Sequence, residues 1–440
     1  MFLVAIGIAA FGLRGFQRAG FTGDGVGYYA PLASLLVDGD LDLANELAHL
    51  NRRYLRAAFM TPDGSWGNPF PVGPAHLWGP AVIVVHWLPA NRVLDANLPE
   101  TTRTRHPGFT PRHARAVLWT NQLLVVWAGV VLCIVLASFA GATLAATAVC
   151  AGILGTPTFF YALQNPSYGH TASFFVVSLF ICTVLLDRQR RVPLEVLGVA
   201  LGLVVLVRSQ DALLGVLVVP RLVQELPARR TPTRWIAALL RLGLPVVILF
   251  APQMVFWQHV YGRPLLIPPG PDFLPWWKPH LPQLLLSTWN GAFLWSPMLA
   301  IGCVGLLTTR DRSLRWAFVA ALVLEFYSSS VLLDWWGGRS FGARRLVSIA
   351  PLAIVGLVFW GQRLRGSRWQ RGIAAGVLVV ACVWNLRLAV HYRDGLLPGN
   401  PGNPPEYLRH PGLGPDHATP YGQWDYARFL RELWRAERLP

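Results

Sequence analysis

An acidic side chain flanked by glycines follows the first apolar segment of the chain. Asp24 stands between two glycines, and Tyr28 and Tyr29 follow one helical turn later. Glycine lets the backbone turn sharply and lets a ligand approach closely, and residues 28–37 are apolar enough to form a helix. A carboxylate just before such a helix can act as a general base toward a hydroxyl or an amine. Asp24 is therefore the predicted catalytic residue, and the two tyrosines are expected to line a substrate cavity.

Further acids follow Asp24 closely. Five of the chain's 22 acidic residues fall within the 23 positions that end at Glu46, and the remaining three are Asp38, Asp40 and Asp42. Such a group either binds a divalent cation through its oxygens or forms a turn and a helix cap. The residues alone leave both readings open. No metal ligand is assigned, and a divalent cation is retained only as an allowed cofactor.

A second polar group, far down the chain, combines arginines with glycines. Arg339, Arg344 and Arg345 share a short stretch with three glycines, and Asp334 precedes them. Arginine offers forked donors that are always charged, and glycine exposes backbone N–H groups. The stretch therefore predicts a phosphate site, with Trp336 lining the substrate cavity. The alternatives are that the arginines contact anionic lipid headgroups or pair with Asp334.

Arg208 is a further candidate for binding phosphate, because it lies between two short apolar runs. An arginine near the centre of a bilayer costs about 2.5–3.5 kcal/mol, so the runs are expected to be short helices that meet at the outer interface. Pairing with Asp211 is the structural alternative. His170 ends a polar turn that predicts either substrate contact or a helix cap, and Asn68 is expected to shape the same cavity.

The elements that must position these residues are apolar helices. The chain is 53% hydrophobic and 14% charged, whereas soluble proteins carry about 25% charged residues. Most apolar runs are long enough to cross a hydrocarbon core of about 30 Å. The sequence predicts an all-α, polytopic membrane helix bundle of about 11 spans, with juxtamembrane surface helices in the first external loop. The expected spans are 2–16, 114–136, 142–162, 170–187, 193–207, 211–225, 235–256, 284–307, 316–333, 345–361 and 372–390.

Arginine-rich loops predict the orientation of the bundle. With 11 spans, the four loops densest in arginine fall on one side, which the positive-inside rule makes cytoplasmic. The net charge of +16 is thus attributed to topology, not to nucleic-acid binding. The long loop 17–113, with Asp24, then lies outside. Segment 77–97 carries two prolines and two tryptophans, which favours a helix on the membrane surface; as a span it would place the later arginine loops outside.

Two parts of the chain are distinguished by composition. Residues 1–390 are expected to form the membrane domain, including the external loop 17–113. Residues 391–440 are expected to form an external tail that begins rich in proline and glycine and ends in a short interfacial helix. The predicted location is the inner or plasma membrane, with the active site on the extracytoplasmic side.

The order of these parts resembles the GT-C superfamily of membrane glycosyltransferases, in the branch of the protein O-mannosyltransferases and the lipid A aminoarabinose transferase. That family has a first span, an external loop with a catalytic acid on a juxtamembrane helix, a proline-bearing motif and a second such helix, followed by a long bundle. Asp24, the stretch 68–71 and segment 77–97 stand in the corresponding places. The resemblance implies that Arg208, or Arg339, Arg344 and Arg345, hold the phosphate of a polyprenyl-phosphate sugar, and that transfer inverts the anomeric carbon.

The expected activity is therefore transfer of a sugar from a polyprenyl-phosphate donor to an extracytoplasmic glycan, lipid or protein. Membrane lipids are the remaining expected partners. One alternative is a transporter or flippase of lipid-linked saccharides, which predicts two related halves with charges near mid-membrane; the sequence shows no such halves. The other is a non-catalytic protein that binds lipids of the cell envelope, whose role would not depend on Asp24.

Overall fold

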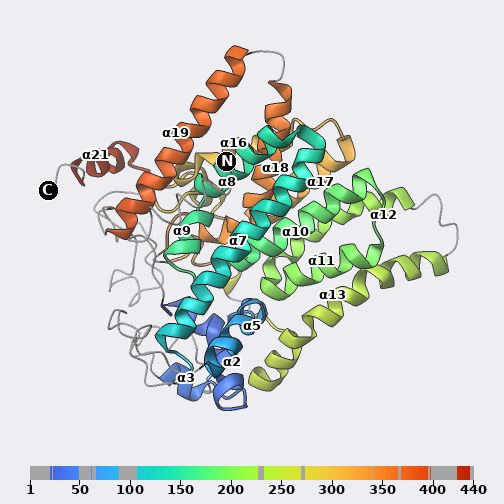
Figure 1. The fold of residues 1–440 in the computed structure, drawn as a ribbon, viewed down its shortest axis with the longest axis vertical. Coiled ribbons are helices and arrows are strands. Elements are labelled where there is room, and N and C mark those ends of the chain that lie inside the picture. The colour runs from blue at the N-terminus through green and yellow to red at the C-terminus, as the bar shows by residue number, and fades with distance from the viewer. Residues whose placement is uncertain are drawn as a thin grey trace. The chain divides into compact units, whose positions relative to one another are not determined.

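The regular secondary structure in the described part of the protein consists of helices joined by loops. The computed structural model describes residues 20–21, 23–48, 61, 66–88, 107–225, 232–268, 273–338, 340–364, 368–394, 397 and 424–436. The regular elements within these ranges are helices (Figure 1), which confirms the expected all-α class. The chain divides into two compact units, one formed by residues 1–131 and 161–272 and the other by residues 132–160 and 273–440.

The first unit combines short helices from the loop after the first apolar segment with longer apolar ones. Its helices are α2 (Asp24–Val37), α3 (Ala44–Ala48), α5 (Gly73–Trp87), most of α7 (Pro111–Ala140), α10 (His170–Gln189), α11 (Leu194–Val207), the 3-10 helix η3 (Ser209–Val218), α12 (Val219–Glu225) and α13 (Pro232–Tyr261). Helix α11 packs closely on α13, because a Cβ on Gly198 or Gly202 would meet the backbone of Leu242 or Val246. Small residues allow such close backbone approach between membrane helices.

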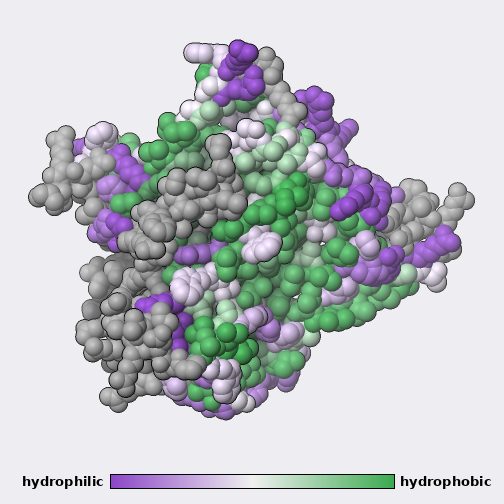
Figure 2. All heavy atoms as spheres, viewed as in Figure 1, coloured by the Kyte–Doolittle hydropathy of each residue, from purple (hydrophilic) through white to green (hydrophobic). Residues whose placement is uncertain are grey.

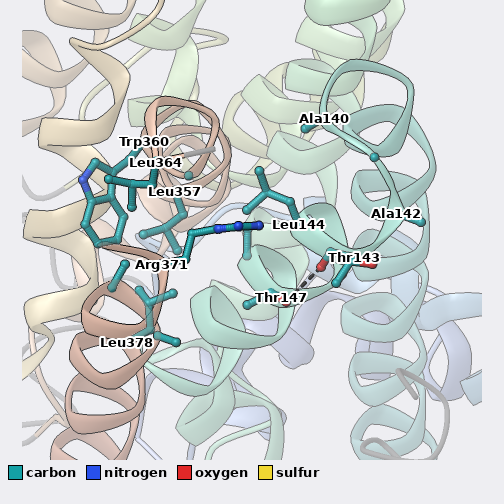
Figure 3. Close-up of a pocket in the computed structure, with 15 residues that line it drawn as sticks. Ala140, Ala142, Thr143, Leu144, Thr147, Leu357, Trp360, Leu364, Arg371 and Leu378 are labelled. Carbon is teal, nitrogen blue, oxygen red and sulfur yellow. Dashed lines mark hydrogen bonds between the residues drawn. The ribbon is translucent and has the colours of Figure 1, made fainter. Parts of the chain in front are cut away.

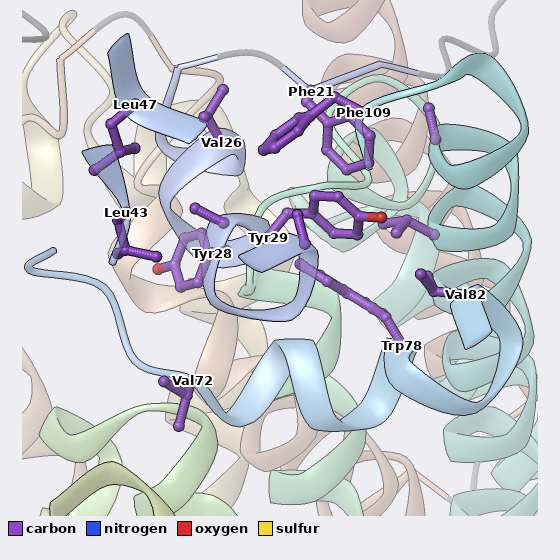
Figure 4. Close-up of a cluster of buried hydrophobic side chains, with 14 of the residues drawn as sticks. Phe21, Val26, Tyr28, Tyr29, Leu43, Leu47, Val72, Trp78, Val82 and Phe109 are labelled. Carbon is purple, nitrogen blue, oxygen red and sulfur yellow. The ribbon is translucent and has the colours of Figure 1, made fainter. Parts of the chain in front are cut away.

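Aromatic side chains hold α2 and α5 within this unit. Tyr29 stacks on Phe21 with ring centroids 4.1 Å apart, and Phe109 meets both rings edge-on at 5.1 and 5.2 Å. Trp78 of α5 is fully buried in the same cluster (Figure 4). Because each aromatic side chain buries about 150–250 Å², this packing anchors the helix that carries Asp24.

The second unit is built from the C-terminal half of the chain and a short segment after α7. Its helices are α8 (Ala142–Leu154), α9 (Thr158–Leu163, of which residues 158–160 belong here), α14 (Leu281–Leu286), α15 (Ala292–Trp295), α16 (Pro297–Leu306), α17 (Arg312–Ser330), the 3-10 helix η5 (Arg344–Ile349), α18 (Ala350–Arg363), α19 (Arg368–Arg393) and α21 (Tyr426–Ala436). Helices α16 and α18 approach closely where Gly302 faces Ala353 and Gly305 faces Gly356.

The described part contains five helices long and apolar enough to cross a membrane, which makes the chain a multi-pass membrane protein. They span Pro111–Ala140, His170–Gln189, Pro232–Tyr261, Arg344–Arg363 and Arg368–Arg393, and α8, α11 and α16 are shorter apolar helices. Helix α13 is mostly exposed and covered by hydrophobic side chains (Figure 2). Such a surface is compatible with hydrocarbon rather than water.

Several expected spans are not continuous helices. The expected span 142–162 divides into α8 and α9 at Gly155–Pro157, and 284–307 divides into α14, α15 and α16. Proline has no N–H to continue a helix. Between α14 and α15, Asn290 adopts a positive φ of 53°. The expected span 211–225 begins as a 3-10 helix, and the first expected span, 2–16, lies outside the described residues. The structure therefore leaves the number of 11 spans as a prediction.

Helices are present at two of the places where surface helices were expected. Helix α5 covers the first part of the expected segment 77–97, up to Trp87, and the remainder from residue 89 lies outside the described residues. In the tail, α21 forms where an interfacial helix was expected. Phe429 and Leu433 of α21 are buried, while Trp424 and Trp434 are exposed. One apolar side of this helix thus packs within the second unit.

Candidate functional site

The candidate site is built around the first residue of α2. Asp24 begins the helix, and the preceding Gly23 adopts a φ of 53° that side chains other than glycine rarely adopt. An acidic side chain in the first helical turn is stabilised by the positive end of the helix dipole. Asp24 is partly exposed, whereas most of the residues that follow it in α2 are buried. Its carboxylate is therefore placed at the edge of the unit, not in its core.

A loop from elsewhere in the first unit covers this end of α2. A Cβ on Gly25 would overlap the side chain of Ser167, and a Cβ on Gly23 would lie 2.6 Å from the hydroxyl oxygen of Tyr168. Only glycine at both positions lets the loop 165–169 come this close. The structure thus explains the glycines around Asp24: they admit a second segment of the protein against its carboxylate-bearing turn.

Three aromatic rings continue the site from this loop. His170, the first residue of α10, lies edge-on to Tyr161 with centroids 4.7 Å apart, and Tyr168 lies 6.0 Å from His170. His170 and Tyr168 are both buried. The predicted site residue His170 is thus brought to the same loop that covers Asp24, as one wall of a tyrosine–histidine cluster.

Asn121 fixes this loop, and sequence reasoning missed it. Its amide nitrogen donates to the carbonyl oxygen of Pro166, and its oxygen accepts from Nε1 of Trp78 at 3.2 Å and from Oγ1 of Thr171 at 2.6 Å. The residue is fully buried in α7. Two adjacent amides, Asn121 and Gln122, inside an apolar run were the signal available in the sequence, because a polar side chain in a membrane helix needs partners.

The start of α5 and the ring of Tyr28 pack against the loop 165–169. A Cβ on Gly169 would lie 2.9 Å from both Pro74 and the ring of Tyr28, so the predicted cavity residue Tyr28 packs on the loop from α2. Asn68 is fully buried, donates to the carbonyl oxygen of Gly27 at 2.8 Å and accepts from the N–H of Phe70 at 3.1 Å. Asn68 therefore ties the 68–71 stretch to α2 with both ends of its amide.

Tyr29 takes a different place from its neighbour Tyr28. Its ring is fully buried in the aromatic cluster of Phe21 and Phe109, and its hydroxyl donates to the carbonyl oxygen of Gly108 at 2.9 Å. Burial raises the pKa of this phenol above its usual range. The structure thus places Tyr29 in the core that supports the site.

Arg208 lies between α11 and η3 and is paired inside the same unit. Its Nε is 3.7 Å from Oδ1 of the fully buried Asp211, and its Nη2 donates to Oε1 of Gln210 at 3.0 Å. The other oxygen of Asp211 accepts from the hydroxyl of Ser173 at 2.6 Å. The structural alternative named for Arg208 is therefore present. The Arg208 side chain is 13% exposed, whereas that of Asp211 is fully buried.

Two short connections link the Asp24 end of α2 to Arg208. The first runs through α10, where His170 joins the loop cluster and Ser173, one turn later, bonds Asp211. The second runs through α5, where Pro74 meets Gly169 and Gly73 packs against the backbone of Val207. The first unit therefore gathers a carboxylate, a tyrosine–histidine cluster and a buried arginine–aspartate pair around the first turns of α5 and α10.

The acids that follow Asp24 serve local structure. Oδ1 of Asp40 accepts from the hydroxyl of Ser34 at 2.9 Å and from the N–H of Asp42 at 3.1 Å, and Oδ1 of Asp42 accepts from the N–H of Ala44 at 3.0 Å. Of the two readings left open, the turn and cap are the ones these contacts form. Within the described ranges no group of three His, Cys, Asp or Glu side chains is placed to hold a metal ion.

Glu46 differs from these exposed acids because it is buried. Burial, and then the neighbouring carboxyl of Asp38, raises the pKa of Glu46 to about 8. Asp38 itself accepts from Nδ2 of Asn45 at 2.9 Å. The loop around α3 thus contains a buried carboxyl that keeps its proton to a higher pH than an exposed acid does.

The second predicted phosphate group lies in the second unit and is partly paired. Nη2 of Arg345 donates to Oδ1 of Asp334, which is the pairing named as an alternative. Nε of Arg344 lies 3.0 Å from the position that a Cβ on Gly337 would take, so Arg344 packs over the glycine turn. Gly337 has a φ of 74°, which suits glycine. Arg339 lies outside the described residues.

Trp336 is held inside this turn. Its side chain is buried and lies edge-on to Trp335 at 5.8 Å. Its carbonyl oxygen accepts from Nδ2 of Asn290 at 2.9 Å, and the same nitrogen reaches Oγ of Ser340 at 3.4 Å. Asn290 is a second amide that sequence reasoning missed, and it bonds the backbone before the two glycines and a side chain after them.

This fold and these sites define a polytopic helical membrane protein. One unit contains a carboxylate–arginine group, and the other contains an arginine–glycine turn. The chain is similar to two crystal structures of ArnT from Cupriavidus metallidurans, one bound to undecaprenyl phosphate and one in the apo state. The identities are 16% and 15%, the TM-scores 0.47 and 0.46, and each match covers 90% of this chain and 72% of the other. No protein-family model and no curated protein sequence matches the chain.

Proposed function

We propose that the protein is a membrane glycosyltransferase that moves a sugar from a polyprenyl-phosphate donor to an extracytoplasmic acceptor. The observation that carries the proposal is the glycine-dependent cover of Asp24. Gly23 and Gly25 let Tyr168 and Ser167 pack against the first turn of α2, which carries Asp24. A solvated loop acid needs no such construction, whereas a base that must be oriented toward an acceptor does.

Asp24 takes the proton of the acceptor hydroxyl or amine in the proposed reaction. The acceptor atom forms a bond to the anomeric carbon while the bond from that carbon to the phosphate oxygen breaks. The electron pair of the broken bond leaves with polyprenyl phosphate, and the configuration at the anomeric carbon inverts. A carboxylate of this kind contributes about 10²–10⁴-fold to a rate.

Arg208 is proposed to stabilise the negative charge that develops on the phosphate. Its pairing with Asp211 fixes the guanidinium, and a fixed donor costs no reorganisation during the reaction. The bond from Ser173 to Asp211 supports this orientation from α10. Tyr28 and His170 are proposed to contact the sugar or the acceptor, since both pack on the loop that covers Asp24.

The arginine–glycine turn of the second unit is the alternative to Arg208 as the proposed site of the donor phosphate. Arg344 lies over Gly337, and Gly338 also adopts a positive φ, of 67°. We propose that Arg344, which packs over Gly337, and Arg345, which also pairs with Asp334, contact phosphate in this group. Arg339 keeps its role as a prediction from the sequence.

A transfer assay with the purified protein and polyprenyl-phosphate sugars tests the proposal. Asp24→Asn is expected to lower turnover at least about 100-fold, while the matched control Asp40→Asn keeps the Oδ1 that Ser34 and Asp42 use and is expected to retain wild-type turnover. Arg208→Gln is expected to raise the KM for the donor, with the folded state checked by thermal unfolding. Full turnover by Asp24→Asn would overturn the assignment of the base. Movement of the lipid-linked sugar across vesicles, without transfer, would favour the transporter instead.

A further inference from the structure

A cavity of about 660 Å³ lies in the second unit, outside the residues assigned above. It is bounded by the turn between α7 and α8, by the end of α18 and by the first half of α19 (Figure 3). Sites for small molecules commonly measure about 300–1,000 Å³. The cavity is thus large enough to take part of an organic molecule.

The inner surface of this cavity is apolar. Leu144 of α8, Leu357 and Trp360 of α18 and Leu378 of α19 contribute most of the large side chains. Helices α18 and α19 belong to segments long and apolar enough to cross a membrane. An acyl chain is the ligand that such a lining fits.

The cavity is cationic at the end where α19 begins. Arg371, in the first turn of α19, extends toward Leu144 of α8 (Figure 3), and Thr143 and Thr147 line the same end. Helix α8 also begins here, and among the described residues no side chain caps it. A helix N-terminus carries a partial positive charge. None of the fifteen lining residues is acidic, so this end of the cavity favours an anion.

Two other arginines, Arg315 of α17 and Arg363 at the end of α18, bond the backbone that follows α16. Arg363 donates through Nε and Nη2 to the carbonyl oxygen of Thr308, and Arg315 donates in the same way to that of Thr309. These two side chains satisfy carbonyls after the end of α16. Neither of them lines the cavity, whereas Arg371 does.

We propose that this cavity binds a glycerophospholipid with an anionic headgroup. Arg371 and the start of α8 hold the headgroup phosphate, and one acyl chain lies against Leu144, Trp360 and Leu378. The pairing of a cationic end with an apolar wall matches the two chemical halves of such a lipid. The site requires none of the residues proposed for glycosyl transfer, so either proposal can fail alone.

Native mass spectrometry of the delipidated full chain tests this site with two lipids. The protein is titrated with dioleoyl phosphatidylglycerol, which is anionic, and with dioleoyl phosphatidylethanolamine, which is zwitterionic. We expect one phosphatidylglycerol to bind about fivefold more tightly than phosphatidylethanolamine, the preference that one arginine near a membrane surface supplies. Arg371→Ala removes this preference. Arg368→Ala, a loss of the same charge in the same helical turn outside the cavity, preserves it.

Thr147→Trp tests the apolar wall. Thr147 is exposed and lines the cavity, so an indole there fills the space without disturbing the core. We expect weaker binding of both lipids, by about fivefold or more if an acyl chain occupies the space. An unchanged preference in Arg371→Ala, an equal loss in Arg368→Ala, or wild-type binding of both lipids by Thr147→Trp would each overturn the proposal.

Discussion

Gly25 of α2 lies so close to Ser167 that a Cβ at position 25 would overlap the serine side chain. Within a helix, alanine is normally about 0.5–1 kcal/mol more favourable than glycine. Here we expect the opposite sign, because overpacking costs about 1–3 kcal/mol. Gly25→Ala should lower the free energy of unfolding and reduce transfer, as measured by SDS-titrated unfolding in mixed micelles and by the transfer assay.

The double variant Gly25→Ala/Ser167→Gly is the control for this contact. It removes the overlapping atoms, and we expect it to recover most of the stability lost in the single variant, a coupling that a double-mutant cycle measures. Gly243→Ala, in α13, introduces the same Cβ where nothing lies within 4 Å and should not destabilise the protein. Equal stability of Gly25→Ala and Gly243→Ala would contradict the close approach.

Asn121 supports the loop over Asp24 with one donor and one acceptor atom. Asn121→Leu should cost at least about 2 kcal/mol, because Pro166, Trp78 and Thr171 all lose a buried partner. Gln122→Ala, the next residue on a less buried side of α7, is the matched control and should change stability little. If the loop depends on Asn121, limited proteolysis should cut Asn121→Leu within residues 165–169 faster than the control. Equal cutting of the two variants would rule out this role.

Asp211 pairs with Arg208 and also accepts a hydrogen bond from the hydroxyl of Ser173. Removing one partner of a fully buried pair costs about 3–5 kcal/mol. Arg208 is 13% exposed, so we expect Asp211→Ala to cost less, about 2–3 kcal/mol, and Ser173→Ala about 1 kcal/mol. The double variant should lose less than the sum, since both single changes remove the same bond. Strict additivity in the unfolding free energies would show that the two contacts are independent.

Glu46 predicts a pH dependence of stability. Its pKa is about 8 in the folded protein against an ordinary value of 4.5, so the folded state holds a proton that the unfolded state has released between these values. The contribution of Glu46 is therefore fully present below pH 4.5 and is lost as pH rises toward 8. Glu46→Gln cannot ionise and should flatten the dependence. Equal slopes of unfolding free energy against pH, in wild type and variant, would contradict the buried protonated carboxyl.

Local composition was enough to predict the helical class and several elements. The expected span 170–187 is α10, the expected span 372–390 lies within α19, and the proline- and tryptophan-bearing segment after residue 77 begins as the helix α5. A run of apolar residues must form backbone hydrogen bonds within itself in a membrane, so its length and its prolines are sufficient evidence for a helix. The same logic failed at 284–307, where Asn290 and Pro297 interrupt an otherwise apolar run.

The sequence by itself determined that Asp24 stands among glycines, that Arg208 and Asp211 lie close together along the chain, and that Asp40 and Asp42 belong to one short acidic stretch. Only the tertiary structure decided what these residues contact. The glycines admit Ser167 and Tyr168, more than 140 positions away, and Asp211 gains Ser173 from another helix. Such contacts depend on which helix faces pack together, and packing over long separations is decided by the whole fold rather than by any local pattern.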